Sequence, residues 1–128
     1  MCKRENRFSL AIAAIKNLPL QISENAIQQG LKSIELPGRL EIVSKKPLII
    51  LDVAHNVESA RVLKECIKKT FKTNKIFLII AMSSNKDIKG FGNILCPLAN
   101  KIILTRFNAQ RSANPNKIKE MLKKFTRK

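Results

Sequence analysis

The stretch "PLIILDVAHNVESARVLKECIKKT", residues 47–70, decides how this chain is expected to fold. Its opening residues, 47–52, are almost all aliphatic and predict a strand. Over 57–71, apolar residues recur at steps of three or four, which predicts an amphipathic helix. That apolar stripe consists of Val57, Ala60, Leu63, Ile67 and Phe71. The stretch is therefore a strand that leads through a short polar loop into a helix.

The same order of strand and helix continues to the end of the chain. The apolar runs 75–82 and 101–105 predict two more strands, the first of them buried and parallel. A helix is expected within 87–98. A last helix is expected after Asn114 and Pro115, an N-cap and first-turn pair. Its apolar stripe consists of Ile118, Met121, Leu122 and Phe125. With a further strand at 40–43, this alternation predicts an α/β domain with a mostly parallel sheet.

The amino-terminal part is expected to be helical and to contain no strand. Residues 8–18 predict an apolar helix that ends at Pro19. Ser23 is expected to cap a second helix that stops at Gly30. Two such short helices cannot form a compact unit by themselves. Because Pro37-Gly38 marks a turn, we expect one segment at 1–35 and a separate domain at 36–128.

Composition excludes several classes of protein. No apolar run approaches the roughly 20 residues of a membrane span, and no secretory signal is expected. The three cysteines, Cys2, Cys66 and Cys96, are odd in number and lack metal-ligand spacing. They suggest a reducing, cytoplasmic location.

The net charge of +16 has two explanations. Abundant Lys, Asn and Ile follow from A/T-rich codons, and this is the explanation we favour. A functional surface for polyanions is the alternative. The lysines are spread along the chain without a recognition motif, so we do not expect a nucleic-acid partner.

Polar residues gather where the predicted strands end. Asp52 closes the first long strand, and His55 and Asn56 follow it. Residues 83–87 and 105–111 take the equivalent places after the next two strands. Ligands of parallel α/β sheets bind at the carboxyl ends of the strands. We therefore expect these loops to converge on one edge of the sheet.

Four short features occur in a specific order: "LPGRLEIV" (36–43), "LDVAHN" (51–56), "NKD" (85–87) and Arg111. The ordered set resembles the carboxyl-terminal domain of folylpolyglutamate and dihydrofolate synthases, in the Mur ligase superfamily. Residues 6–18 and 22–31 also look like the last helices of that family's central ATPase domain. The resemblance implies a three-layer, Rossmann-like fold over 36–128, preceded by a helical remnant of the ATPase domain over 1–35.

The resemblance also implies an activity. Members of this family use ATP and Mg²⁺ to phosphorylate a pteroate or folate carboxylate, and the amino group of L-glutamate attacks the acyl phosphate. The roles carried over are catalysis for Arg39 and His55, nucleotide binding for Arg39, Asp52 and Asn56, and substrate binding for His55, Lys86 and Asp87. Physically, Arg39 offers a guanidinium fork for phosphate oxygens, and Asp52 suits a ribose hydroxyl. No metal ligand is assigned.

Structural explanations for the same residues remain open. Asp52 and Asn56 could cap the helix at 57–71, and Asp87 could cap the next one. Arg39 could be a solvated surface residue. The chain also departs from the family pattern: Val53 and Val57 replace Gly and Pro.

The sequence has no G-x-x-x-x-G-K-[ST] phosphate loop. In the family, this loop and the magnesium ligands belong to the amino-terminal part. The chain therefore resembles a slice of a ligase cut at both ends, and we expect no ligase activity from it alone. It would work with a separately encoded ATPase half, or be a gene remnant. The alternatives are a stand-alone nucleotide- or anion-binding module and a small basic nucleic-acid-binding protein.

Overall fold

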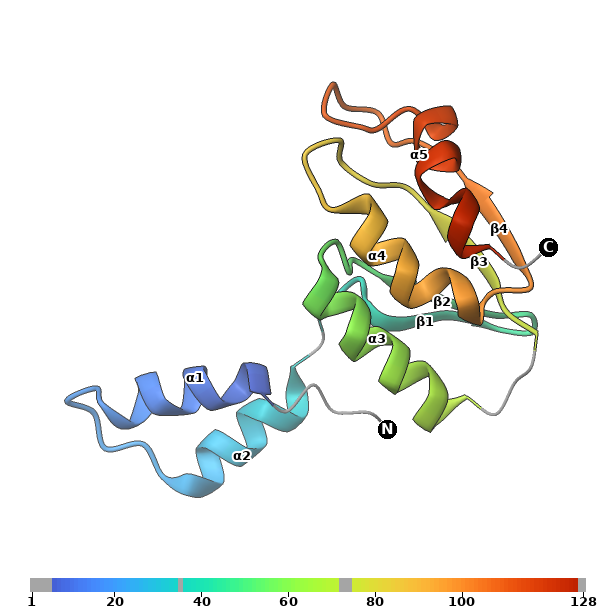
Figure 1. Ribbon diagram of the computed structural model, residues 1–128. Coiled ribbons are helices and arrows are strands. Elements are labelled where there is room, and N and C mark those ends of the chain that lie inside the picture. Colours follow the sequence, from blue (N-terminus) through green and yellow to red (C-terminus); the bar gives the residue numbers. More distant parts are fainter. Residues whose placement is uncertain (1–5, 35, 72–74, 127–128) are drawn as a thin grey trace. The chain divides into compact units, whose positions relative to one another are not determined.

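A computed structural model describes residues 6–34, 36–71 and 75–126. The chain divides into two compact units, residues 1–52 and 53–128, and Figure 1 gives the elements of each. Cys2 lies outside the described residues. Within the described residues, no helix combines the length and apolar character that crossing a membrane requires.

The first unit begins with two helices, α1 (Asn6–Lys16) and α2 (Glu24–Ser33). Ser23 caps α2 as predicted, and its side chain accepts a hydrogen bond from the Ala26 N–H at 3.2 Å. The predicted stop at Gly30 is wrong, because α2 continues to Ser33. A helix can pass through glycine at a cost of about 1 kcal/mol, and here the Ser33 hydroxyl donates back to the Gly30 carbonyl at 2.9 Å.

The rest of this unit is a hairpin of β1 (Arg39–Lys45) and β2 (Leu48–Asp52), paired antiparallel. The mostly parallel sheet predicted from the sequence is therefore not what the described residues form: they make two separate two-stranded sheets. The physical reason is the connection of two residues between β1 and β2. A parallel pair needs a crossover of about a dozen residues, whereas two suffice for a hairpin.

The second unit has the predicted alternation of helix and strand. Its elements are α3 (Val57–Thr70), β3 (Phe77–Ile80), α4 (Ile88–Leu95), η1 (Cys96–Leu98), β4 (Lys101–Leu104), α5 (Pro115–Leu122) and η2 (Lys123–Phe125). β3 and β4 pair in parallel. Figure 1 shows α4 between α3 and α5, and α4 contacts both. The α/β class predicted from the sequence is confirmed.

The core of the second unit lies among these three helices. Its largest fully buried side chains are Cys66, Leu95, Cys96, Ile118 and Leu122. A methyl group at Gly92 on α4 would collide with Leu122 on α5, so these two helices approach closely only because Gly92 has no side chain.

The two described cysteines of this core differ in state. Cys96 is a free thiol whose pKa is raised by burial. Cys66 is disulfide-bonded, which differs from the reduced state expected for all three cysteines.

The strands of this unit are less buried than expected. β3 is shorter than the predicted strand at 75–82, and it is not buried on both faces: Phe77 is 59% exposed and Ile79 is 66% exposed. Ile103 on β4 is exposed as well. Successive side chains of a strand point to opposite faces, and the helices of this unit cover one face.

Candidate functional site

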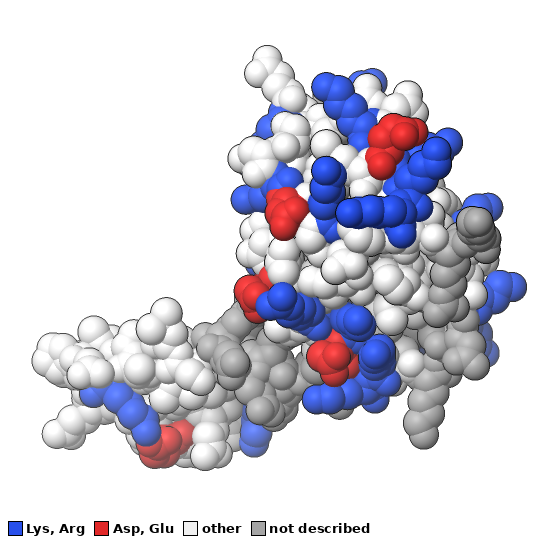
Figure 2. Space-filling model, in the orientation of Figure 1, with Lys and Arg blue, Asp and Glu red and all other residues white. Residues whose placement is uncertain are grey.

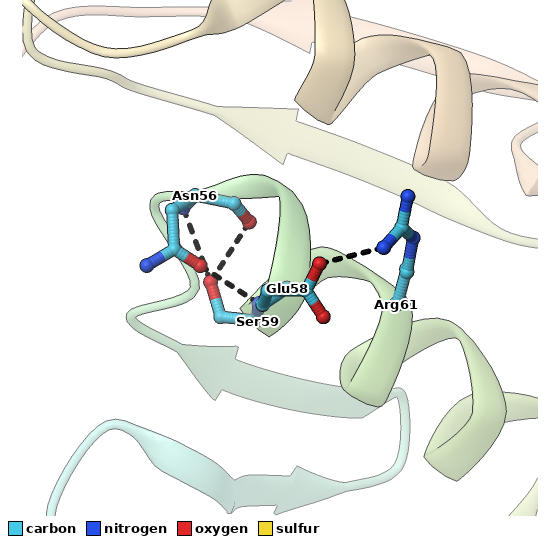
Figure 3. Close-up of polar contacts among 4 residues, drawn as sticks. All are labelled: Asn56, Glu58, Ser59 and Arg61. Atoms are coloured by element: carbon cyan, nitrogen blue, oxygen red, sulfur yellow. Dashed lines mark hydrogen bonds and ion pairs between the residues drawn. The ribbon is translucent and has the colours of Figure 1, made fainter.

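The turn into α3 is held by a reciprocal set of hydrogen bonds (Figure 3). Asn56 is the N-cap, and its side-chain oxygen accepts from the Ser59 N–H at 2.8 Å. The Ser59 hydroxyl oxygen accepts from the Asn56 N–H at 3.1 Å, completing a capping box. The explanation of Asn56 as the cap of the helix that begins at Val57 is therefore confirmed. Its side-chain amide N–H groups are not used in this box, so the cap does not preclude a role toward a ligand.

His55 lies beside this cap and is exposed. Its backbone N–H donates to the Ser59 hydroxyl oxygen at 3.1 Å, and its ring Nδ1 lies 3.0 Å from the Val53 carbonyl oxygen. A carbonyl oxygen only accepts, so this contact requires the proton to be on Nδ1. In the neutral ring, Nε2 is then the nitrogen that carries the lone pair. The loop thus presents a hydrogen-bond acceptor at Nε2.

In the first unit, the hairpin brings Arg39 and Asp52 opposite each other in register. The pairing is irregular between Arg39 and Glu41, where Leu40 has φ 52°. The Leu40 N–H donates to Asp52 Oδ2 at 3.0 Å. In the turn just before β1, the Gly38 N–H donates to Glu41 Oε2 at 2.7 Å, and Gly38 has φ 66°. The Pro37-Gly38 turn is confirmed, and Arg39 and Asp52 are cross-strand partners at one end of the hairpin.

Asp87 begins α4 in the way that Asn56 begins α3. Its Oδ1 accepts from the Gly90 N–H at 2.8 Å, so the N-cap explanation of Asp87 is confirmed. A methyl group at Gly90 would collide with the Asp87 carboxylate and lie 2.7 Å from Val57 Cγ2. The first turns of α3 and α4 are therefore close neighbours, which places Lys86 and Asp87 near the start of α3.

The loops after β3 and β4 are joined by backbone hydrogen bonds. The Ser84 N–H donates to the Arg111 carbonyl at 2.8 Å, and the Ala113 N–H donates to the Met82 carbonyl at 2.8 Å. Residues 83–87 and 105–111 therefore converge, as predicted for this pair of strands. Lys86, Arg106 and Arg111, all exposed, place three cations on these joined loops.

The structure groups the predicted site residues in two sets. Arg39 and Asp52 belong to the hairpin of the first unit, and His55, Asn56, Lys86, Asp87 and Arg111 belong to the second. Sequence reasoning missed Ser59, whose hydroxyl binds the backbone of both His55 and Asn56. Its signal was present, because a hydrogen-bonding side chain three residues after an N-cap is half of a capping box.

The described residues do not supply a metal site. Within them, no group of three or more His, Cys, Asp or Glu side chains is placed to hold a metal ion. The Arg39–Asp52 pair, in contrast, has the charges that a nucleotide's phosphates and ribose require.

Removing the Ser59 hydroxyl should loosen the start of α3. We expect Ser59→Ala to lower the free energy of unfolding by about 1 kcal/mol, the usual cost of losing a helix cap. Urea denaturation followed by circular dichroism measures this change. Ser84→Ala is the matched control, since Ser84 is exposed and only its backbone N–H is used. Equal effects of the two substitutions would contradict a special role of Ser59.

Comparison with known proteins assigns the chain to a family. Residues 38–128 match the family described as Mur ligase, glutamate ligase domain. The dihydrofolate synthase/folylpolyglutamate synthase of Escherichia coli (strain K12) is 44% identical over 80 residues, which cover 62% of this chain and 19% of that protein. The protein of the same name from Buchnera aphidicola subsp. Acyrthosiphon pisum is 37% identical over 92 residues, 72% of this chain and 22% of that protein.

Solved structures agree with this assignment. The structure of E. coli FolC in complex with DHPP and ADP matches 88% of this chain with a TM-score of 0.80 and 35% identity, over 27% of that chain. A bifunctional folylpolyglutamate synthase/dihydrofolate synthase with Mn, AMPPNP and L-glutamate bound matches with a TM-score of 0.73 and 35% identity, over the same shares. The chain thus spans about a quarter or less of these relatives. It belongs to the Mur ligase family through the glutamate ligase domain, and it resembles the carboxyl-terminal domain of dihydrofolate/folylpolyglutamate synthases.

Proposed function

We propose that this chain is the glutamate-facing part of an ATP-dependent ligase that joins L-glutamate to a pteroate or folate carboxylate. The observation that carries the proposal is the pairing of Arg39 with Asp52 within a match to the glutamate ligase domain. Relatives with bound ADP, DHPP and L-glutamate support it. Bound ATP would supply the activation of the carboxylate.

Two residues of the hairpin would hold the nucleotide. The Arg39 guanidinium would donate to phosphate oxygens through two parallel N–H groups, the strongest form of such contact. The Asp52 carboxylate, fixed through the Leu40 N–H at 3.0 Å, would accept hydrogen bonds from the ribose hydroxyls. The hydrogen bond to Leu40 orients the carboxylate before the nucleotide arrives, which reduces the ordering that binding requires.

The second unit would receive the amino acid. With its proton on Nδ1, His55 would accept a proton or hydrogen bond at Nε2 from the substrate's amino group. Lys86 would bind a glutamate carboxylate. Asp87 caps α4 through Oδ1, and its Oδ2 would face the ammonium group. Asn56 would donate from its side-chain amide to a phosphate oxygen beside the N-terminus of α3, where the helix dipole favours negative charge.

The remaining parts of the reaction would come from an amino-terminal ATPase half, carried by the same or a separate polypeptide. That half would supply the phosphate loop and the Mg²⁺ ligands, with residues 1–35 continuing its helices and residues 36–128 forming the glutamate ligase domain. In the complete ligase, we propose that this domain is a three-layer, Rossmann-like unit. A cytoplasmic location stays a prediction from the sequence.

The nucleotide assignment can be tested on the isolated chain with ADP and 2′,3′-dideoxy-ADP. Asp52→Asn keeps an oxygen for the Leu40 N–H but loses the negative charge. We expect it to weaken ADP binding about tenfold, the equivalent of 1.4 kcal/mol. The parent chain should prefer ADP over the dideoxy analogue by a similar factor, and the variant should prefer neither. Isothermal titration calorimetry measures all four affinities.

Glu120→Gln is the control for charge, because it removes an exposed carboxylate from α5 and should leave the ADP affinity within about twofold. If Asp52→Asn binds ADP as the parent does, the ligase-type nucleotide site is wrong, and a repurposed anion-binding module becomes the better explanation.

A further inference from the structure

Arg39 stands at the end of a tight turn. Residues 36–39 form this turn, and the Arg39 N–H closes it by donating to the Leu36 carbonyl at 3.2 Å. Pro37 and Gly38 occupy the two central positions, and Gly38 has φ 66°. Proline followed by a residue with positive φ is the pattern of a type II turn, which favours glycine at the second central position. Arg39 is therefore both the last residue of the turn and the first residue of β1.

Two carboxylates hold the backbone on either side of Arg39. Before it, the Gly38 N–H donates to Glu41 Oε2 at 2.7 Å. After it, the Leu40 N–H donates to Asp52 Oδ2 at 3.0 Å. Leu40 has φ 52°, a left-handed conformation that crowds the Cβ of a leucine, so the surrounding contacts have to maintain it. Three consecutive amides are thus bound, and the backbone of Arg39 is fixed from both sides.

The charge of Glu41 cannot be what favours a nucleotide here. The chain has 25 Lys and Arg against 9 Asp and Glu, and Figure 2 shows that cations far outnumber carboxylates on the face it presents. Such a surface attracts an anionic nucleotide, whereas a carboxylate two residues from Arg39 opposes that attraction. Any gain in nucleotide affinity from Glu41 therefore has to come from its hydrogen bond with the Gly38 N–H.

We propose that Glu41 is a positioning residue of the nucleotide site. By accepting from the Gly38 N–H, it holds the turn from which Arg39 reaches the phosphates, and it contacts no substrate itself. This role rests on the proposed function, because it needs Arg39 to bind phosphate. A guanidinium makes two parallel hydrogen bonds to phosphate oxygens only in a defined orientation. Without Glu41, the turn would have to be ordered when the nucleotide binds, and that ordering lowers affinity.

The test measures the ADP affinity of the full chain by isothermal titration calorimetry. Glu41→Ala removes the acceptor and also one negative charge, so attraction of an anion alone would strengthen binding. We expect it instead to weaken binding about fivefold. Glu41→Gln keeps an oxygen at the same reach and should stay within about twofold of the parent. When Arg39→Ala has already weakened binding, adding Glu41→Ala should change the affinity less than about twofold, because the two residues act through one contact.

Glu24→Ala is the matched control, because Glu24 is an exposed carboxylate of the same unit and pairs with Lys16 at 2.8 Å. It makes the same change in net charge and should leave the ADP affinity within about twofold. Exchange of the Gly38 amide hydrogen gives a readout without nucleotide, and it should be about tenfold faster in Glu41→Ala. Unchanged circular dichroism confirms that the variants are folded.

The positioning role and the proposed function fail in different ways. If Arg39→Ala weakens ADP binding but Glu41→Ala does not, Glu41 has no positioning role and the proposed function stands. Equal losses in Glu41→Ala and Glu41→Gln would assign the effect to charge, and an equal loss without Arg39 would show that Glu41 does not act through it. Unchanged exchange at Gly38 excludes the hydrogen bond on which the role depends. If Arg39→Ala binds ADP as the parent does, the nucleotide site itself is wrong, and the positioning role fails with it.

Discussion

A chimeric E. coli dihydrofolate synthase/folylpolyglutamate synthase, with its matched segment replaced by the corresponding residues of this chain, is expected to ligate glutamate in an ATP-dependent reaction. The isolated 128-residue chain is expected to give no turnover under the same conditions, since its sequence contains no phosphate loop. Comparing the chimera with the isolated chain shows whether this domain can take part in ligation when an ATPase part is supplied. Release of ADP, coupled to formation of the glutamylated product, measures both activities.

Within the chimera, Arg39→Ala should lower kcat/KM by about a hundredfold or more, the usual effect of losing a donor that stabilises developing charge on oxygen. Arg39 is half-buried and lies opposite Asp52 at the end of the hairpin. Nucleotide phosphates that it contacts would lose both a charge and a bidentate hydrogen bond.

Arg61→Ala is the matched control for this change. The Arg61 side chain is 62% exposed and pairs with Glu58 on the surface of α3, so its loss should change kcat/KM less than about threefold. A folded chimera without activity would contradict the proposal that this domain retains its ligase function. If the chimera is active and Arg39→Ala does not lower its activity, the ligase function is supported but Arg39 does not belong to the site.

Periodicity predicted the second unit well because each of its elements has a clean local signal. The stripe from Val57 to Phe71 gave α3, and Asn114-Pro115 gave the start of α5. The antiparallel hairpin does not follow from periodicity, because two apolar runs look alike whether their strands pair parallel or antiparallel. Only the length of the connection between β1 and β2 distinguishes the two arrangements. Gly30 shows that one unfavourable residue does not end a helix whose other residues support it.

The order of the motifs predicts which residues belong to the site, but it does not predict the contacts that their side chains make. Asp87 occupies its expected place, yet its observed contact is a helix cap, and the sequence does not say which oxygen remains for a ligand. The irregularity at Leu40, with its positive φ, depends on the register of two strands. Such features arise from pairing between distant residues, and local patterns do not encode them.

Ile118→Ala should have one of the largest effects of any single substitution on the stability of the second unit. Ile118 lies in the middle of α5 with 0% exposure, beside the close approach of α4 and α5 at Gly92 and Leu122. Truncating a fully buried isoleucine removes apolar contacts and leaves a cavity, at a cost of about 2–5 kcal/mol. Since small domains are stable by about 5–15 kcal/mol in total, the loss should be evident as a large fall in the urea midpoint.

Met121→Ala tests whether this cost comes from the core and not from helix propensity. Met121 is the neighbouring residue of the same helix, and it is 37% exposed. Both substitutions introduce the best helix former, so α5 itself should not be weakened by either. We expect Met121→Ala to cost about 1 kcal/mol or less, in proportion to the apolar area it still buries. Similar falls in the urea midpoint for both variants would mean that α5 does not pack on α4 through Ile118. A large loss confined to Ile118→Ala would confirm that α5 is held in the core of the second unit through Ile118.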